Sequence, residues 1–218
     1  MNKPVKIDFV SDVACPWCAV GLGALEQALA NLGDEVQVEL HFHPFELNPD
    51  MPPGGQDVIE HLTQKYGMPE EQVRKNQTAI RERAAAVGVT FHPEGRKRVY
   101  NTFNAHRLIH WAGVEAGAEA QRRIKKELLA TYFTLAISMD DPENLIDAVQ
   151  RAGLDADRAR EILTSTEFEA ETRASEQKYL GLGISSVPSL ILNDKYLLQG
   201  AQPVESFEQA LRQLASAS

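Results

Sequence analysis

Cysteine is scarce in this chain: its 218 residues include only two, Cys15 and Cys18. Secreted proteins that depend on a disulfide scaffold use more cysteines, spread further along the chain. A structural zinc site needs four ligands, commonly from two such pairs, and the sequence offers no second pair. His41 and His43 could be considered as ligands, but they fall on the polar face of an alternating segment. We therefore predict no metal site, and a single close pair of thiols indicates redox chemistry.

Long apolar runs are absent as well. No segment approaches the roughly 20 apolar residues that a helix needs to span a bilayer. The first residues, Met1–Pro4, lead directly into a strand-like segment and show neither the apolar core nor the small-residue cleavage site of a signal peptide. We therefore expect a cytoplasmic protein without a membrane partner.

Positive charge is in short supply, because 31 acidic and 22 basic residues give a formal net charge of −9. Such a chain is poorly suited to nucleic acids or anionic membranes, which argues against both as main partners. Two basic clusters, Arg96–Arg98 and Arg122–Lys126, are interpreted as solvated helix surface. With 43% hydrophobic and 24% charged residues, the chain otherwise has the composition of one large globular domain, or of a domain with a sizeable insertion.

The N-terminal part follows a strand–helix–strand pattern. Residues 5–10 are typical of a strand, and a helix is predicted from Pro16, whose missing N–H costs nothing in a first turn, to a stop at Gly33. Residues 36–43 alternate strictly between apolar and polar side chains and predict a second strand. The intervening helix is long enough for a parallel crossover.

The rest of the chain divides into a helical block and a mixed end. Residues 56–180 carry helical stripes almost throughout, after a proline- and glycine-rich loop over residues 44–55. Residues 189–192 and 195–199 predict two strands joined by a tight turn at Asn193-Asp194, before a last helix. We expect the two ends to form one sheet, with the helical block as a lid over it.

The two cysteines lie at a predicted helix start, which gives each thiol a different environment. Cys15 is beside unpaired backbone N–H groups and the positive end of the helix dipole, and both stabilise a thiolate. Cys18 lies one turn on, begins the buried leucine stripe and is within reach of any mixed disulfide on Cys15. We expect Cys15 to be exposed and to attack, and Cys18 to be buried and to resolve. The Pro16-Trp17 dipeptide between them disfavours the alternative of two inert core thiols.

Several motifs resemble the DsbA-like thioredoxin superfamily. Cys15-Pro16-Trp17-Cys18 follows Asp8-Phe9, and Ile184–Ser189 is similar to the segment that carries the superfamily's cis-proline, which would be Pro188. The chain is more similar still to the cytoplasmic FrnE-like dithiol oxidoreductases, through the stretches His43–Pro49, Asn101–Leu108 and Gly200–Pro203.

This resemblance implies an α/β thioredoxin-like fold with a large all-helical insertion between its β-α-β and β-β-α halves. The discontinuous thioredoxin-like domain would comprise residues 1–47 and 181–218, and the inserted helical domain residues 48–180. The resemblance also implies that Pro188 faces the cysteine pair and that the backbone of Val187 pairs with a bound substrate.

One departure concerns the residues between the cysteines. Many periplasmic relatives have a histidine there, where this chain has Trp17. A neutral indole supplies no charge to a thiolate, so Cys15 is expected to be less acidic, and its disulfide less oxidising, than in those relatives.

Two other functions stay open. Hydroxychromene-carboxylate isomerases and kappa-class glutathione transferases share the implied architecture but typically carry serine at the position of Cys15, and in this alternative Asn48 contacts glutathione. A non-catalytic, chaperone-like binding module is the third hypothesis. Dithiol exchange is favoured because both cysteines are present; it requires no cofactor, although glutathione can serve as co-substrate.

The expected partners are protein or small-molecule thiols and disulfides, and the oligomeric state, including a homodimer, stays open.

The third helical stripe contains two histidines, His106 and His110. Both can be hydrogen-bonded rings at a partly buried helix face. Alternatively, as the family resemblance favours, His106 lies at the lid surface facing Cys15, where it favours the thiolate or carries a proton. Phe103 would then form a packing wall for the substrate.

Overall fold

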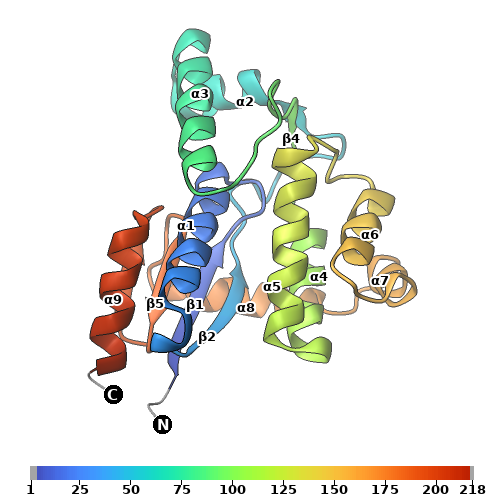
Figure 1. Ribbon diagram of the computed structural model, residues 1–218. Helices are drawn as coiled ribbons and strands as arrows, with labels where there is room; N and C mark the ends of the chain where they lie inside the picture. Colours follow the sequence, from blue (N-terminus) through green and yellow to red (C-terminus); the bar gives the residue numbers. More distant parts are fainter. Residues whose placement is uncertain (1–3, 217–218) are drawn as a thin grey trace.

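The computed structural model describes residues 4–216 and contains one four-stranded mixed sheet (Figure 1). In sheet order the strands are β2 (Val38–Pro44), β1 (Val5–Ser11), β5 (Ser189–Leu192) and β6 (Tyr196–Gln199). β1 runs parallel to β2 and antiparallel to β5, and β6 pairs antiparallel with β5 at the edge. The two ends of the chain therefore build one sheet, as the sequence predicts.

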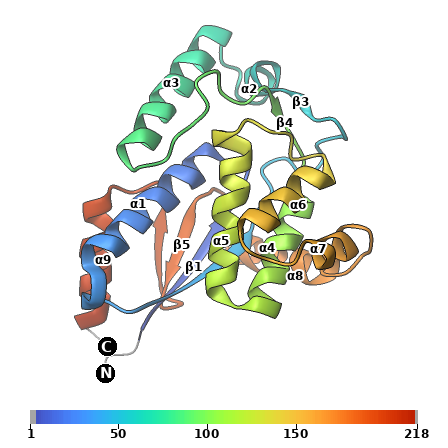
Figure 2. The same cartoon turned by 45° about the vertical axis from the view of Figure 1, so that its right-hand side comes forward.

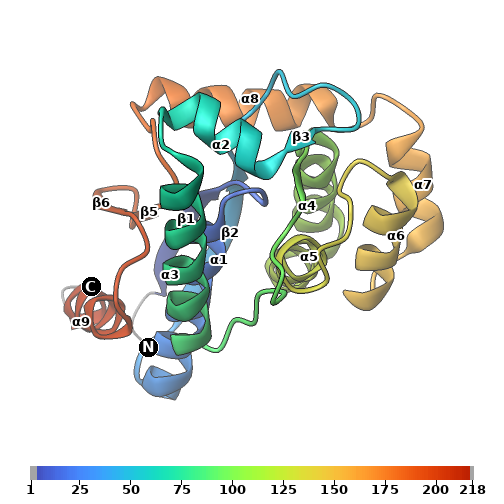
Figure 3. The same ribbon diagram turned by 90° about the horizontal axis from the view of Figure 1, so that it is seen from above.

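Helices cover both faces of this sheet. α1 (Pro16–Leu32) connects β1 to β2 and lies with α9 (Val204–Ser216) on one face, whereas α8 (Glu169–Gly181) lies on the other (Figure 3). Leu22, Leu25 and Leu32 of the predicted stripe of α1 are buried, and Leu29 is half-buried against the core. The helix ends at Gly33, whose φ is 50°, and a 3-10 turn over Gly33–Glu35 follows.

Between β2 and β5 the chain is mostly helical. Its helices before α8 are α2 (Val58–Tyr66), α3 (Glu70–Ala86), α4 (Phe103–Ala116), α5 (Ala118–Leu129), α6 (Pro142–Arg151) and α7 (Ala156–Leu163), with a π-helical turn at Ala130–Thr134. The insertion is not all-helical, because β3 (Gln56–Asp57) and β4 (Arg98–Val99) form a small antiparallel sheet. Strands of two residues are too short to show an alternating pattern in the sequence. Over residues 4–216, no helix has both the length and the apolar character that crossing a membrane requires.

One hydrophobic core runs through the sheet and the helical block. Phe9 of β1 packs on Phe42 of β2, with ring centroids 5.5 Å apart, and shares a buried cluster with Leu108 of α4 and Leu128 of α5. α2 and α3 lie above the N-terminal end of α1 (Figures 1 and 2). Apolar packing therefore holds the helical block against the sheet.

The turn between β5 and β6 has the conformation that its residues favour. Asn193 and Asp194 have φ angles of 51° and 55°, as the two central residues of a type I′ turn require. The side-chain oxygen of Asn193 accepts a hydrogen bond from the Lys6 N–H at 2.9 Å, which ties the turn to β1.

The interpretation of the two basic clusters as solvated helix surface is wrong for three of their members. Arg98 lies in β4 and donates to two carbonyls of the loop before β3, at 2.7 and 2.8 Å. Arg96 lies in the loop before β4 and donates to the carbonyl of Ala14. Lys125 of α5 is only 1% exposed. Charge runs indicate solvation on average, but Lys125 is buried, Arg96 is half-buried, and Arg98, although exposed, lies in a strand and binds the loop before β3.

Arg107 of α4 is buried and holds the loop that follows α7. Its guanidinium donates to the carbonyls of Ile162, Ser165 and Glu167 at 2.7, 2.7 and 2.8 Å. Backbone oxygens at a helix end lack partners within the helix. Arg107 therefore satisfies several carbonyls at once.

Arg107→Met is expected to lower the free energy of unfolding by about 3–5 kcal/mol, because it removes the guanidinium donors of the Ser165 and Glu167 carbonyls and one donor of the Ile162 carbonyl. Urea unfolding followed by circular dichroism measures this change. The matched control is Arg74→Met, which removes an exposed ion pair with Glu70 and should cost less than about 1 kcal/mol. Equal losses in the two variants would contradict this role of Arg107.

Candidate active site

The two cysteines lie at the N-terminus of α1, as predicted. Cys15 is the cap residue, with extended φ and ψ angles of −89° and 114°, and its carbonyl accepts a hydrogen bond from the Cys18 N–H at 3.1 Å. Both are free thiols, and Cys18 is completely buried. The expectation of an exposed Cys15 is wrong: the residue is only 5% exposed and lies against the loop at Val187, with α2 and α3 above this end of α1. Cys15 instead borders a cavity.

The two thiols have opposite acidities. The Cys18 thiol donates a hydrogen bond to Cys15, which lowers the pKa of Cys15 below its ordinary value even though burial opposes this change. The backbone N–H groups of Cys18 and Trp17 at the helix start act in the same direction as the thiol. Burial raises the pKa of Cys18 well above its ordinary value. Of the two, Cys15 is therefore the first to form a thiolate.

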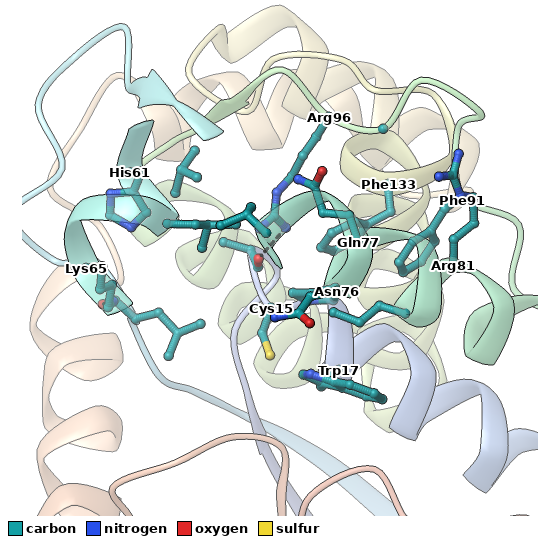
Figure 4. A pocket seen from close by; sticks show the side chains of 18 of the residues that line it. Cys15, Trp17, His61, Lys65, Asn76, Gln77, Arg81, Phe91, Arg96 and Phe133 are labelled. Atoms are coloured by element: carbon teal, nitrogen blue, oxygen red, sulfur yellow. Dashed lines mark hydrogen bonds between the residues drawn. The ribbon is translucent and has the colours of Figure 1, made fainter. Parts of the chain in front are cut away.

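The residues between the cysteines have different surroundings. Pro16 occupies the first turn of α1, where its missing N–H leaves no helical bond unmade. The Trp17 side chain is 37% exposed and lies at the edge of the cavity near Cys15 (Figure 4). It gives the site an apolar edge and supplies no charge.

A loop that is distant in sequence meets Cys15. The Val187–Pro188 peptide bond is cis. The Val187 carbonyl lies 3.7 Å from Cys15 Sγ, within the range of a thiol hydrogen bond. Pro188 packs on α1 at Gly21, where an added Cβ would lie only 3.1 Å from Pro188 Cγ. The fold thus brings Cys15 and Val187 together across more than 170 residues of sequence.

Asp12 organises the backbone before and beyond the cysteine pair, a role that no pattern in the sequence indicates. Its buried carboxylate accepts hydrogen bonds from the N–H groups of Ala14 at 3.1 Å and Leu47 at 2.8 Å. His106 Nε2 lies 3.3 Å from the same carboxylate. Burial opposes ionisation, but the bonds from His106 and the backbone keep the pKa of Asp12 below its ordinary value. A buried negative charge therefore fixes the loop that leads into Cys15.

His106 and Phe103 do not have the places expected of them. His106 is 2% exposed and faces Asp12, so it acts on the cysteine loop only through that carboxylate. Phe103 packs against the Arg173 guanidinium, whose carbon lies 3.6 Å from the ring centroid. Neither side chain belongs to the cavity wall formed by the described residues. The helical spacing in the sequence predicts that Phe103 and His106 lie on one face of α4. It does not predict which side chains, Arg173 and Asp12, these two residues contact.

A cavity of about 400 Å³ extends from Cys15 towards α2 and α3 (Figure 4). Asn48 lies in its wall, and the Asn48 side-chain oxygen accepts a hydrogen bond from Lys65 Nζ at 2.8 Å. Arg96 lies in the wall as well and is held by the Ala14 carbonyl at 2.8 Å. Two cations and an amide therefore line one half-open cavity with the thiol. In the part of the chain that the structure describes, no group of three His, Cys, Asp or Glu side chains is placed to hold a metal ion.

Lys125 of α5 is another titratable group that the sequence analysis missed. It is buried, and burial lowers its pKa to about 8. The charges that act on it are those of Cys18, Asp12 and Cys15, and all three favour the protonated amine. Its signal in the sequence is its position three residues before the buried Leu128, on the inward face of the helix.

The chain is similar in sequence and in fold to known proteins. Residues 6–212 match the DSBA-like thioredoxin domain family. The crystal structure of a probable DsbA oxidoreductase from Streptomyces coelicolor has a TM-score of 0.88 and 34% sequence identity, covering 98% of this chain and 91% of that one. The uncharacterized protein YwbO of Bacillus subtilis is 28% identical, over 95% of this chain and 96% of its own length. The cytosolic disulfide reductase DsbM from Pseudomonas aeruginosa, solved with glutathione, is 14% identical and has the same fold, with a TM-score of 0.62 over 97% of this chain and 98% of that one. The chain therefore belongs to the DSBA-like thioredoxin domain family.

Proposed function

We propose that this protein is a thiol–disulfide oxidoreductase in which Cys15 is the attacking thiol and Cys18 the resolving thiol. The observation that carries the proposal is the placement of two free thiols at one helix start, with Cys15 as the cap residue beside a cavity and Cys18 fully buried one turn on. This placement gives the two thiols opposite acidities. A nucleophilic thiol must ionise readily, whereas a resolving thiol must lie close and stay protonated until the mixed disulfide has formed. Membership of a family of DsbA-like proteins supports an oxidoreductase.

The exchange proceeds in two steps. The Cys15 thiolate attacks one sulfur of a substrate disulfide, so that a bond forms to Cys15 Sγ and the other substrate sulfur leaves as a thiolate. Cys18 then loses its proton and attacks Cys15 Sγ, which forms the Cys15–Cys18 disulfide and releases the second substrate thiolate. The substrate gains two electrons and the protein loses two. In the reverse direction the oxidised pair oxidises a substrate dithiol.

The loop around Val187 is proposed to position the substrate. Its carbonyl already lies beside Cys15 Sγ, and Pro188 has no N–H that would occupy a neighbouring acceptor. An extended peptide or thiol can therefore pair with Val187 in strand-like fashion. We further place the protein among the FrnE-like cytoplasmic enzymes on the motifs His43–Pro49 and Asn101–Leu108. The cytosolic location of DsbM is compatible with this assignment.

The redox equilibrium with glutathione tests the proposed roles. Wild-type protein is expected to form an intramolecular disulfide in one two-electron transition, and Cys18→Ser to form only a glutathione adduct on Cys15. Alkylation of the remaining thiols followed by mass spectrometry measures both species. If Cys15 and Cys18 form no disulfide at any ratio of oxidised to reduced glutathione, the proposal fails.

A glutathione-dependent isomerase or kappa-class-like glutathione transferase is the second candidate. The observation that favours it is the presence of Asn48 and Lys65 in the cavity wall near Cys15. In this alternative Cys15 holds the thiolate of glutathione and Cys18 is dispensable. Insulin reduction with dithiothreitol and glutathione conjugation are therefore compared in wild type and Cys18→Ser. Conjugation that survives in Cys18→Ser, with no insulin reduction by the wild type, would favour the alternative.

A further inference from the structure

The cavity beside Cys15 differs in charge from the molecule as a whole. The chain has a formal net charge of −9, yet the described wall contains the cations Lys65, Arg81 and Arg96 and a single carboxylate, Glu94. Glu94 is itself paired with Lys97 at 3.0 Å. The local field in the cavity therefore favours an anionic ligand.

Two of these cations keep hydrogen-bond donors for a ligand. Lys65 Nζ donates to the Leu47 carbonyl at 2.7 Å and to Asn48 at 2.8 Å, which uses two of its three N–H groups. Arg96 donates one of its five N–H groups to Ala14, the residue before Cys15. Figure 4 shows Lys65 on α2 and Arg96 on the opposite side of the space above Cys15. Both cations therefore border the same cavity as Cys15 and can donate to an anionic group there.

Most of the remaining wall is apolar. α3 contributes Val73 and Ile80, and the far side contributes Phe91 and Phe133, whose stacked rings have centroids 4.7 Å apart. A volume of about 400 Å³ is within the range of small-molecule sites, roughly 300–1,000 Å³. Walls of this kind favour an aromatic or aliphatic body over a polar peptide.

We propose that this cavity binds small disulfides that have an aromatic body and a carboxylate, with the carboxylate between Lys65 and Arg96. The inference rests on the proposed function, because Cys15 is the thiol that reacts with the bound disulfide. Cys15 Sγ bonds to one substrate sulfur while the substrate S–S bond breaks and an aromatic thiolate leaves. Cys18 then releases its proton to solvent and displaces the second aromatic thiolate, which leaves the protein oxidised by two electrons.

Stopped-flow oxidation of the reduced protein tests this substrate class. The probes are 5,5′-dithiobis(2-nitrobenzoate), which is aromatic and anionic, 2,2′-dithiodipyridine, which is aromatic and neutral, and cystamine, which is aliphatic and cationic. Glutathione disulfide, which is aliphatic and anionic, is measured in the same way. Each rate constant is divided by that of dithiothreitol with the same probe, which removes the intrinsic reactivity of the disulfide. The rate with the anionic probe is expected to saturate with concentration. Its normalised rate constant should exceed that of the neutral probe about tenfold, and cystamine should react most slowly.

Variants of residues in the cavity wall test separately how the charge and the shape of the cavity affect the reaction rates. Lys65→Met is expected to reduce the preference for the anionic over the neutral probe about tenfold. Ile80→Trp fills the cavity and is expected to slow both aromatic probes. The matched control is Lys75→Met, which removes a lysine from the exposed surface of α3, where it pairs with Glu71, and should change neither rate. If Ile80→Trp does not fold, calorimetric titration of 2-naphthoate into wild type, Lys65→Met and Lys75→Met measures the same site at equilibrium.

Three outcomes would overturn the inference or its basis. If the rate saturates with none of the probes, and Lys65→Met has the same probe preference as Lys75→Met, the proposed ligand site is refuted. The proposed exchange at Cys15 and Cys18 would not be affected by this result. A faster normalised reaction with glutathione disulfide than with the anionic aromatic probe would assign the cavity to glutathione instead. Failure of every probe to oxidise the pair would refute the proposed function itself.

Discussion

Replacing Cys15 by serine is expected to lower the rate of thiol–disulfide exchange by roughly 10⁴-fold or more, to the rate without protein. Serine cannot form the thiolate that attacks a disulfide, and Cys18 is completely buried and has a raised pKa. Cys18→Ser is expected to keep the first step and to stop at a mixed disulfide on Cys15. Insulin reduction with dithiothreitol measures the exchange, and intact-protein mass spectrometry measures the mixed disulfide.

The two serine variants control for each other, because both replace a buried thiol at the start of α1. Their circular dichroism spectra and unfolding midpoints should stay close, so that a difference in trapped adduct reports chemistry and not folding. An adduct that accumulates on Cys18 in Cys15→Ser as fast as on Cys15 in Cys18→Ser would contradict the assigned roles.

Lys125→Met is expected to stabilise the protein and to slow the resolving step. The pKa of Lys125 is about 8 in the folded protein and 10.5 in a solvated chain. The burial of its charge therefore costs about 3 kcal/mol at neutral pH, at roughly 1.4 kcal/mol per tenfold change in proton affinity. Methionine has a similar length and no charge, so the free energy of unfolding at pH 7 should rise by about this amount. Lys125 also lowers the pKa of Cys18, so the mixed disulfide should persist longer in the variant.

The stabilisation by Lys125→Met should depend on pH in a defined direction. Below pH 8 Lys125 is protonated in both the folded and the unfolded wild-type chain. The difference in the free energy of unfolding between variant and wild type is therefore constant in this range. Between pH 8 and 10.5 the unfolded chain binds more protons at Lys125 than the folded one, so the wild type gains stability relative to the variant as pH rises. Urea unfolding of both proteins at pH 7, 8.5 and 10 measures the difference. The burial of a charged Lys125 would be contradicted if the stability advantage of the variant grew with pH. It would also be contradicted if the variant were less stable than the wild type at pH 7.

The parts of the fold that the sequence predicts are those with strong local signals. Leucines at steps of three and four define α1, strict alternation defines β2, and Asn193-Asp194 defines the turn to β6. Cys15 and Cys18 are recognisable because their spacing and helix-start position have a direct chemical meaning. Each of these features depends on neighbours within about one turn or one strand.

The features that the sequence does not predict arise from contacts between distant segments. Cys15 is buried, and the contact that it makes with Val187 comes from a loop more than 170 residues later. Arg96 and Lys125 belong to charge runs that look like solvated surface, and only their tertiary neighbours bring them close to the thiols. Asp12 lies among ordinary turn residues, and its role becomes visible only through its bonds to Leu47 and His106. A single sequence records none of these pairings.

The most direct test of the account is the pH dependence with which each cysteine of the reduced wild-type protein reacts with iodoacetamide, resolved by peptide mass spectrometry. Cys15 is expected to be alkylated first, along a titration curve whose midpoint lies below the ordinary pKa of a thiol, while Cys18 stays unmodified until the protein unfolds or the pH is far higher. Alkylation of Cys18 before Cys15, or a common midpoint for the two thiols, would contradict the assignment of Cys15 as nucleophile and Cys18 as resolving thiol.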